Sequence, residues 1–469
     1  MKDSAAQRNY VLGLLTLVYA FNFVDRQILG ILGPGIIADL EINDSQFGLL
    51  TGFVFALFYT VVGLPIAWAA DRFNRITIVS ISLAVWSGFT ALSGFVVSFW
   101  QLALARVGVA VGEAGGSPPS HAVLSDLFKD SERGRSLGIY SLGIPFGYML
   151  AFFSTAALAG ADSIPWRTTL IVLGIPGVIV AVILKLTVKD PVRGSQEVTK
   201  TEPLPFKQAL TKLLRIKSYW AMCLGISFAS FGGYAIATYS VIYITRAFPE
   251  VDVRQILVAL GFINGLAYAG GVYVGGYLAD RGAGHSVGSY ALSPILGLVI
   301  GVPAIMLGFL SDSYWFFMAM VSLFVFFTGF YLGPSFSVAQ SLAPPEVRAT
   351  SSAVFFFVLN MIALGGGPTF VGWLSTTLTP SYGALDALRY AQISLIVPYI
   401  LSVVAFGFAV KWLPGDWRGG AKDTAARKTL RRLKGAYGRA SSCRSLRVLR
   451  RPSVESFLCW YNIKVPRIG

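Results

Sequence analysis

The sequence predicts an all-α membrane protein in which twelve transmembrane helices form two pseudo-symmetric six-helix bundles. The first observation is composition: 55% of the 469 residues are hydrophobic and 13% are charged, about half the charged fraction of soluble domains. The second is a series of apolar runs, each long enough to cross a hydrocarbon core of about 30 Å. The third is one long polar segment near the middle of the chain, which divides the runs into two sets of six.

The predicted spans are stretches of about 20 or more mainly apolar residues, the length that an α-helix needs to cross a bilayer. They cover residues 10–37, 46–70, 76–98, 100–128, 136–160, 166–188, 218–246, 254–279, 286–310, 313–342, 350–378 and 385–412. The first run is too long for the apolar core of a signal peptide and contains Asp25 and Arg26. We therefore interpret it as an uncleaved span.

Four parts follow from this division. Residues 1–188 are the predicted N-terminal bundle and residues 218–413 the C-terminal bundle, and a cytoplasmic linker at 189–217 joins them. Residues 414–469 form a basic tail that we expect to be disordered. The tail holds 14 Lys and Arg against 3 Asp and Glu, so it supplies 11 of the net +15 charges. The membrane-embedded body is close to neutral, which argues against nucleic acid as a partner.

The positions of lysine and arginine predict the orientation, because cytoplasmic loops carry an excess of both residues. With both termini in the cytoplasm and the tail left out, the cytoplasmic side holds 18 Lys and Arg and the outer side holds 4. The outer arginines are Arg167, Arg246, Arg254 and Arg389. The sequence therefore predicts a multi-pass protein of the cytoplasmic membrane with both termini cytoplasmic.

Four acidic or basic residues lie well away from the ends of predicted spans: Asp25 and Arg26 in the first, and Arg106 and Glu113 in the fourth. Charges at bilayer depth are costly unless they are paired or hydrated, and they usually mark a transport path. At a rise of about 1.5 Å per residue, Asp25 and Arg106 fall at similar depth, and Glu113 lies about 10 Å deeper. We expect an outer cluster in which Asp25 faces Arg106, with Arg26 nearby and Glu113 alone near the midplane.

Three roles remain open for these charges. A carboxyl group can carry a coupling proton when its partners rearrange between states. Glu113 is the first choice because no arginine adjoins it in this arrangement, and Asp25 stays an alternative. The two arginines instead suit an anionic phosphate head group, which matches their planar fork of donors. The simplest alternative is that the four charges only stabilise the N-terminal bundle as compensating pairs.

The two halves repeat a short motif at the cytoplasmic end of a span. Residues 67–72 read AWAADR and close the second span, and residues 276–281 read GYLADR and close the eighth. The motif resembles the signature of the major facilitator superfamily, although Ala67 and Asn74 replace two glycines in the first copy. This resemblance implies the major facilitator fold. We interpret the charges at these span ends as a conformational latch, formed by Asp71, Arg72, Arg75, Asp280 and Arg281.

Within that superfamily the chain resembles the Spinster-like branch. The resemblance is carried by NFVDR at 22–26, RVGVAVGEA at 106–114 and PEVRA at 345–349. It covers about residues 9–412 and implies a carrier of lysophospholipids, sphingosine phosphate or related amphiphiles, with proton coupling. The family pattern favours Asp25 as the proton carrier as strongly as the charge argument favours Glu113.

The C-terminal half has no central charge, but it is rich in polar and aromatic side chains. Asn264 and Tyr268 are i, i+4 neighbours and share one helix face. A charged N-terminal half opposite an aromatic C-terminal half would suit the head and the tail of an amphiphile. The candidate cavity residues are Asn22, Tyr59, Tyr140, Asn264, Tyr268, Phe330, Phe357, Asn360 and Met361.

These features predict a secondary active transporter that works by alternating access, couples to protons and moves an amphiphilic lipid. A lysophospholipid or a sphingosine-phosphate-like molecule is the expected substrate. The alternative within transport is a proton-coupled carrier of small drugs, sugars or organic anions. The alternative of another class is a lipid scramblase or channel. We expect a monomer whose further partners are membrane lipids.

An enzyme is disfavoured because the sequence lacks a catalytic constellation. It contains no HExxH pair and no GxxxxGK[ST] loop, and its GxSxG match at 284–288 lies in a short loop. A nucleophile elbow needs a strand before the serine and a helix after it. Two histidines and three scattered cysteines give no metal site. The sequence therefore predicts no cofactor, with the proton as the coupling ion.

Overall fold

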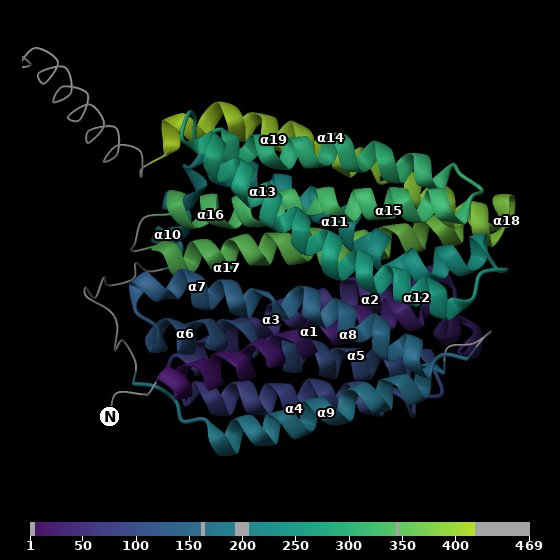
Figure 1. Ribbon diagram of the computed structural model, residues 1–469, viewed down its shortest axis with the longest axis horizontal. Helices are drawn as coiled ribbons and strands as arrows, with labels where there is room; N and C mark the ends of the chain where they lie inside the picture. The colour runs from purple at the N-terminus through teal and green to yellow at the C-terminus, as the bar shows by residue number, and fades with distance from the viewer. Residues whose placement is uncertain (1–4, 161–164, 193–205, 344–346, 418–469) are drawn as a thin grey trace, which may run out of the picture. The chain divides into compact units, whose positions relative to one another are not determined.

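The computed structural model describes residues 5–160, 165–192, 206–343 and 347–417, and Figure 1 shows its helices running side by side. Within these ranges the secondary structure is helical and contains no β-strand. The described residues belong to one structural unit, which ends at Trp417. Residues 418–469 of the predicted tail and 193–205 of the predicted linker lie outside the described residues.

The helices of the N-terminal half extend from the start of the described chain to the end of the sixth predicted span. They are α1 (Ala5–Asp39), α2 (Asp44–Thr51), α3 (Phe53–Ala70), α4 (Arg75–Ser93), α5 (Phe99–Glu113), α6 (Ser117–Leu127), α7 (Asp130–Ser141), α8 (Gly143–Leu158) and α9 (Trp166–Thr187).

The short helix α10 (Phe206–Leu214) precedes the C-terminal half. That half consists of α11 (Lys217–Ala247), α12 (Val253–Phe262), η1 (Ile263–Ala267), α13 (Tyr268–Ala283), α14 (Ser289–Phe309), α15 (Tyr314–Thr328), η2 (Gly329–Tyr331), α16 (Leu332–Leu342), α17 (Arg348–Leu359), η4 (Asn360–Gly366), α18 (Gly367–Ile393) and α19 (Ile396–Asp416).

Ten helical segments of the described chain are long and apolar enough to cross a membrane, and nine correspond one to one to predicted spans. The tenth, Thr350–Asp416, holds 67 residues, which is about 100 Å of helix. It therefore covers the last two predicted spans, and its backbone turns at Gly383, where φ is 77°. The remaining span, 100–128, is present as α5 and α6, which residues 114–116 separate. The twelve predicted spans are confirmed.

The second, fourth and fifth spans of each half are interrupted. In the N-terminal half the breaks fall at Gly52, at residues 114–116 and at Leu142. In the C-terminal half the π-helix η1, the 3₁₀-helix η2 and the π-helix η4 interrupt the corresponding spans. The agreement supports the internal duplication that the repeated motif indicates. Interrupted helices in membrane transporters frequently lie beside the substrate pathway.

Each half has its own packing, and several pairs of elements join the halves. In the N-terminal half α4 packs against α5 and α9, and α1 against α8; in the C-terminal half α11 packs against α18 and α19, and α14 against α15. Between the halves α1 packs against α11, α2 against α18, α8 against α12, and α3 against η4. The two six-helix bundles thus meet along all four of these helix pairs.

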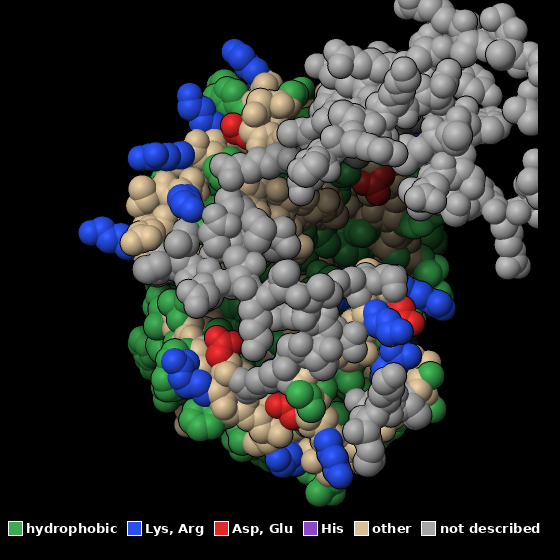
Figure 2. Space-filling model, turned by 90° about the vertical axis from the view of Figure 1, so that its left-hand side faces the viewer, with side chains coloured by type: hydrophobic (Ala, Val, Ile, Leu, Met, Phe, Trp, Pro, Cys, Tyr) green, Lys and Arg blue, Asp and Glu red, His purple; other side chains and the backbone are tan. Residues whose placement is uncertain are grey.

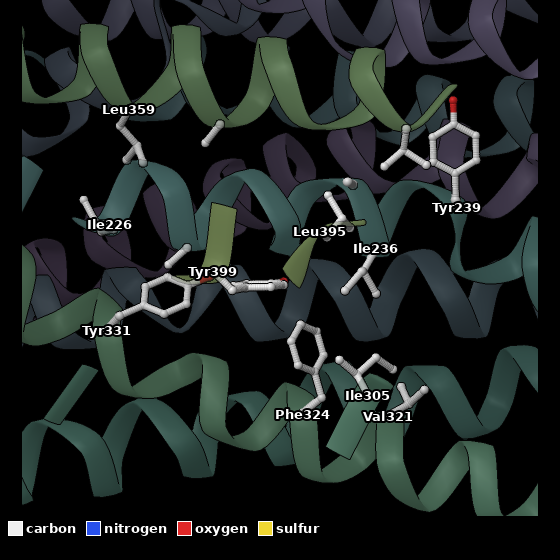
Figure 3. Close-up of a cluster of buried hydrophobic side chains, with 14 of the residues drawn as sticks. Ile226, Ile236, Tyr239, Ile305, Val321, Phe324, Tyr331, Leu359, Leu395 and Tyr399 are labelled. Carbon is white, nitrogen blue, oxygen red and sulfur yellow. The ribbon is translucent and has the colours of Figure 1, made fainter. Parts of the chain in front are cut away.

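Figure 3 shows the core of the C-terminal half, where large apolar side chains of α11, α14, α15 and α19 meet. The rings of Phe324 and Tyr399 lie 6.1 Å apart, edge to face. Glycine permits the closest approach of helices in this core. A Cβ atom on Gly271 of α13 would lie 1.8 Å from the carbonyl oxygen of Phe326, so only glycine allows the two helices to touch here.

The outer surface fits an integral, multi-pass membrane protein. Large apolar side chains are exposed along several helices, for example Leu104 at 70% and Leu186 at 78%. Such side chains are stable in contact with the hydrocarbon of a bilayer. The backbone N–H and C=O groups are hydrogen-bonded within the helices and need no water. Figure 2 shows one end of the helices, where Lys and Arg side chains gather at the rim and hydrophobic side chains line a hollow.

Candidate functional site

Glu113 is the centre of a buried polar cluster in the N-terminal half. It ends α5 and is 0% exposed. Its Oε2 atom accepts hydrogen bonds from Asn22 Nδ2 at 2.9 Å and from Arg26 Nε at 2.9 Å. Asn22 and Arg26 are i, i+4 neighbours, so α1 presents both to α5 on one face. The Arg26–Glu113 ion pair therefore connects the first and fourth spans.

Asp25 points to a different neighbour, although it adjoins Arg26 in the sequence. Its Oδ1 atom accepts a hydrogen bond from the Thr90 hydroxyl of α4, and that hydroxyl lies 3.0 Å from the carbonyl oxygen of Trp86. Asp25 is 4% exposed. Its hydrogen-bond partner is thus a neutral hydroxyl group.

Arg106 lies against an aromatic ring. Its guanidinium carbon is 4.7 Å from the centroid of Phe55 on α3, and the residue is 2% exposed. Three buried polar atoms of the cluster have no hydrogen-bond partner among the described residues: Arg106 Nε, Glu113 Oε1 and Asn22 Oδ1. A buried donor or acceptor without a partner costs about 1–3 kcal/mol. The cluster can therefore accept a polar ligand that both donates and accepts hydrogen bonds.

The predicted pairing of the four charges is wrong in one respect. We expected an Asp25–Arg26–Arg106 cluster with Glu113 alone, but Arg26 pairs with Glu113. Successive residues of an α-helix point about 100° apart, so Asp25 faces α4 while Arg26 faces α5. Rise per residue predicts the depth of a side chain and leaves its direction around the helix open. All four charges nevertheless lie together in the N-terminal half.

Aromatic side chains enclose Arg26. Its guanidinium carbon lies 4.8 Å from the ring centroid of Tyr59 and 5.5 Å from that of Phe23. The hydroxyl of Tyr234, on α11 of the other half, also interacts with Arg26. Sequence reasoning missed Tyr234 and Thr90. A phenol in the middle of a predicted span, directly after Gly232 and Gly233, was the available signal.

Three of the predicted cavity residues in the C-terminal half lie where the halves meet. The ring of Tyr268 is 6.2 Å from that of Tyr148 on α8, and the hydroxyl of Tyr148 accepts a hydrogen bond from Gln27 at 3.2 Å. Asn360 and Met361 belong to η4, which packs against α3. Met361 contacts the apolar cluster of the N-terminal half.

The other predicted cavity residues lie apart from the Glu113 cluster. Tyr140 is 1% exposed and stacks on Tyr19 at 4.4 Å inside the N-terminal half. Phe330 is 2% exposed and fills the space beside Gly275 inside the C-terminal half. Asn264 donates a hydrogen bond to Leu260 of its own helix, at 2.9 Å. Phe357 is 46% exposed on α17.

Four of the predicted latch residues make contacts within their own half. Arg75 holds Asp126 at 2.5 Å and Asp190 at 3.0 Å, which joins α4, α6 and the chain after α9. Arg72 lies 4.1 Å from the ring of Trp68. In the C-terminal half, Asp280 accepts a hydrogen bond from Tyr290 at 2.9 Å, and Arg281 donates one to Tyr277 at 3.2 Å. Asp71, the fifth latch residue, ends the same span as Arg72.

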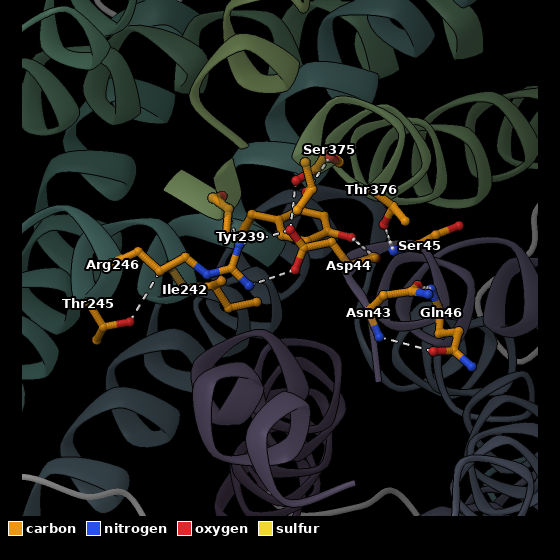
Figure 4. Close-up of polar contacts among 12 residues, drawn as sticks. Asn43, Asp44, Ser45, Gln46, Tyr239, Ile242, Thr245, Arg246, Ser375 and Thr376 are labelled. Carbon is orange, nitrogen blue, oxygen red and sulfur yellow. Dashed lines mark hydrogen bonds and ion pairs between the residues drawn. The ribbon is translucent and has the colours of Figure 1, made fainter. Parts of the chain in front are cut away.

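Asp44 forms a second polar cluster, which joins the two halves (Figure 4). It begins α2 and is 6% exposed. Its carboxylate binds two nitrogens of Arg246 at 2.7 and 2.8 Å and the hydroxyl of Ser375 at 2.7 Å. Its carbonyl oxygen accepts a hydrogen bond from Tyr239 at 2.7 Å. Sequence reasoning did not select Asp44, because acids are common in the loops between spans.

Further contacts between the halves lie at the same end as Asp44. The amide of Ser45 donates to the Thr376 hydroxyl at 2.8 Å, and Arg254 Nε donates to the Ala159 carbonyl at 2.7 Å. A Cβ atom on Gly48 would lie 2.4 Å from the carbonyl oxygen of Pro368, so α2 and α18 are in backbone contact. This end of the interface is closed, and it lies opposite the end that carries Arg75 and Asp280.

Comparison with known proteins gives the same family for most of the chain. Residues 15–368 match the model of the Major Facilitator Superfamily. An MFS-type efflux pump of Mycolicibacterium smegmatis is 33% identical over 388 residues, which are 82% of this chain and 88% of that protein. A probable galactarate/D-glucarate transporter of Bacillus subtilis is 27% identical and covers 84% of this chain and 92% of its own.

A solved structure is also similar over most of its length. It is a bacterial homolog of the human lysosomal transporter Spinster, in an inward-facing and unoccupied conformation. The match has a TM-score of 0.81 and 28% sequence identity, and it covers 88% of this chain and 99% of that one.

Proposed function

This chain belongs to the Major Facilitator Superfamily, and from that premise we propose that it is a proton-coupled transporter of an amphiphilic lipid. A lysophospholipid or a sphingosine-phosphate-like molecule is the substrate class, and alternating access is the mechanism. That the chain is a membrane transporter and not an enzyme follows from its family. The observation that carries the finer proposal is the buried Arg26–Glu113 pair.

Proton coupling rests on what neutralisation of Glu113 does to its partners. When Glu113 is charged, its Oε2 atom holds Arg26 and Asn22. A proton on Glu113 removes the charge that Arg26 compensates, and the guanidinium is then available to an anionic ligand. Proton binding and head-group binding are linked in this scheme through one arginine. Asp25, hydrogen-bonded to Thr90, is the second candidate for the proton.

The proposal of a lipid substrate is based on two features, the polar cluster around Glu113 and the apolar hollow. Arg26 and Arg106 can hold a phosphate through their forks of donors. The unpartnered Asn22 Oδ1 and Glu113 Oε1 can accept hydrogen bonds from hydroxyl or amino groups of the head group. Hydrophobic side chains line the hollow in Figure 2 and suit an acyl tail. The similar structure of a Spinster homolog supports the same substrate class.

The membrane arrangement is part of the proposal. We place the protein in the cytoplasmic membrane with both termini in the cytoplasm, and the basic rim of Figure 2 supports this orientation. Residues 1–188 and 218–413 are the two bodies that move, joined by the linker at 189–217. The protein acts as a monomer. Its partners are the substrate and membrane lipids, and nucleic acid is not among them. It uses no cofactor, and the proton is the coupling ion.

A carrier of small organic anions is the second candidate. Two arginines at a buried site bind carboxylates as well as phosphates, and the similar transporter of Bacillus subtilis is named for galactarate and D-glucarate. In that case the apolar hollow has no role in binding the substrate. A scramblase or channel is the candidate of another class. Counterflow separates it from a carrier, because an open pore cannot accelerate exchange with substrate on the opposite side.

Uptake into proteoliposomes tests the proposal. The purified protein is assayed with a panel of lysophospholipids, sphingosine phosphate and galactarate, with and without an imposed pH gradient. We expect lipid uptake that rises with the gradient and shows counterflow. Gradient-independent uptake would remove proton coupling, and uptake of galactarate alone would favour the small-anion carrier. Arg26→Gln, which removes the guanidinium group of the site, is assayed in the same way. Its control is Arg135→Gln, which changes an exposed arginine outside the site.

A further inference from the structure

Helix α10 lies in the linker between the halves, and one of its sides packs against the C-terminal half. Ala209 and Leu213 on this side are both 0% exposed. The indole nitrogen of Trp220 donates a hydrogen bond to the carbonyl oxygen of Leu213 at 3.1 Å. These contacts hold α10 against α11 and α17 (Figure 1). The position of α10 at the end of the C-terminal half is therefore fixed by packing.

The apolar side of α10 is wider than the area that α11 and α17 cover. At about 100° per residue, Leu210 and Leu214 form a second strip next to the docked one. Leu214 is 59% exposed. A helix that lies in the plane of a membrane surface has such a strip, which rests on the boundary of the acyl chains.

Basic side chains occupy exposed positions of α10 and the residue after it. Lys207, Lys212 and Arg215 line a shallow hollow of about 310 Å³ together with Gln208 and Thr211. Lys207 and Arg215 are exposed and lie about 12 Å apart along the helix. An exposed leucine beside exposed cations is the pattern that anionic lipid attracts, since the lipid offers a phosphate and an acyl chain together.

We propose that α10 binds the anionic phospholipid head groups of the adjoining leaflet, with Lys207 and Arg215 on phosphate and Leu214 at the acyl boundary. Charge complementarity favours anionic lipid over the C-terminal tail of the chain as the group that binds this face. Residues 418–469 carry 14 Lys and Arg against 2 Asp and Glu, so the tail repels this face of α10. The lipid site is separate from the Glu113 cluster and does not depend on the transported substrate.

Lipid binding to the purified full-length protein tests the proposal. Native mass spectrometry counts bound phosphatidylglycerol and phosphatidylcholine of the same acyl composition. We expect the wild-type protein to retain phosphatidylglycerol in preference to phosphatidylcholine. Lys207→Gln/Arg215→Gln should weaken phosphatidylglycerol binding by about tenfold or more and leave phosphatidylcholine binding unchanged. Lys207→Arg/Arg215→Lys keeps both charges and should bind as wild type does.

Matched variants identify which feature of α10 is responsible. Lys129→Gln/Arg135→Gln removes two exposed charges at α7 and should leave the preference intact. Leu214→Gln should weaken the binding of both lipids. The proposal is overturned if Lys207→Gln/Arg215→Gln binds phosphatidylglycerol as tightly as wild type does. It is also overturned if the α7 variant loses as much phosphatidylglycerol binding as the α10 variant. Displacement of phosphatidylglycerol by millimolar inorganic phosphate would also contradict it, since that result indicates a site for soluble anions.

Discussion

At the scale of single residues, Arg26 links the groups that we assign to coupling. It bonds Glu113 at 2.9 Å, lies over the ring of Tyr59 and reaches Tyr234 of the opposite half. The side chains of Arg26 and Glu113 are 10% and 0% exposed. Removing one partner of a buried ion pair leaves the other charge uncompensated, at a cost of about 3–5 kcal/mol.

A double-mutant cycle measures this pair. Arg26→Gln and Glu113→Gln should each lower the free energy of unfolding by about 3–5 kcal/mol, and the double variant should lose much less than the sum. The measurement is unfolding of the purified protein in detergent. Arg8→Gln/Glu132→Gln is the matched cycle, because that pair is exposed at 25% and 47% and should couple by less than about 1 kcal/mol. Additive losses at Arg26 and Glu113 would refute the pairing.

Thr90→Val separates the two candidate proton carriers. Valine keeps the shape of threonine but cannot donate a hydrogen bond to Asp25. If Asp25 carries the proton, the pH profile of uptake should move and proton-driven uptake should fall several-fold. If Glu113 carries it, the profile should match wild type, and this is the result we expect. Thr155→Val is the control, since Thr155 is also buried but bonds its own helix at Ala151.

The residue types of the site were predictable from the sequence, and their partners were not. Asp25, Arg26, Arg106 and Glu113 are conspicuous because charge is rare inside a span. Thr90 and Tyr234 are neutral, and hydroxyl groups are common inside spans. The choice of Glu113 by Arg26 depends on how α1 is rotated against α4 and α5, and packing over the whole bundle sets that rotation.

At the scale of helices, the paired interruptions distinguish this fold from a simple bundle. The spans and their number follow from apolar length, and the repeated motif at 67–72 and 276–281 indicates the duplication. The sequence does not mark η1 and η4, since a π-turn needs one extra residue per turn and no special residue type. Gly52 separates α2 from α3, and its neighbour Gly48 touches α18.

Gly48→Ala tests whether close approach of α2 and α18 matters. The new Cβ would lie 2.4 Å from the Pro368 carbonyl oxygen and 2.6 Å from the Tyr239 hydroxyl, so the helices must separate at a cost of about 1–3 kcal/mol. We expect impaired uptake and a lower melting temperature in detergent. Gly63→Ala, where nothing lies within 4 Å, should be harmless. Equal effects of the two variants would show that the contact is unimportant.

At the scale of the whole molecule, the halves are held together at the end that contains Asp44. Asp44 of the N-terminal half binds Arg246 and Ser375 of the C-terminal half. The contacts of Arg75 and Asp280, at the opposite end, stay within one half. Alternating access requires that the Asp44 contacts break when this end opens. Their strength therefore sets the balance between the two states.

Asp44→Asn should shift that balance toward opening of the Asp44 end. Losing one charge of a hydrogen-bonded pair costs about 2–5 kcal/mol, which corresponds to roughly a 30-fold or larger change in the ratio of states. The distance between spin labels at positions 41 and 381 should increase in the variant. Asp39→Asn breaks an ion pair with Arg167 inside one half and should leave that distance unchanged. An unaltered distance in Asp44→Asn would disprove the role of this cluster.

The most direct test of coupling through Glu113 is a comparison of two transport modes in Glu113→Gln proteoliposomes. Glutamine keeps the hydrogen-bonding shape of the side chain and cannot exchange a proton at neutral pH. We predict that uptake driven by a pH gradient is lost while counterflow of the lysophospholipid substrate continues. Gradient-driven uptake at the wild-type rate would contradict the account.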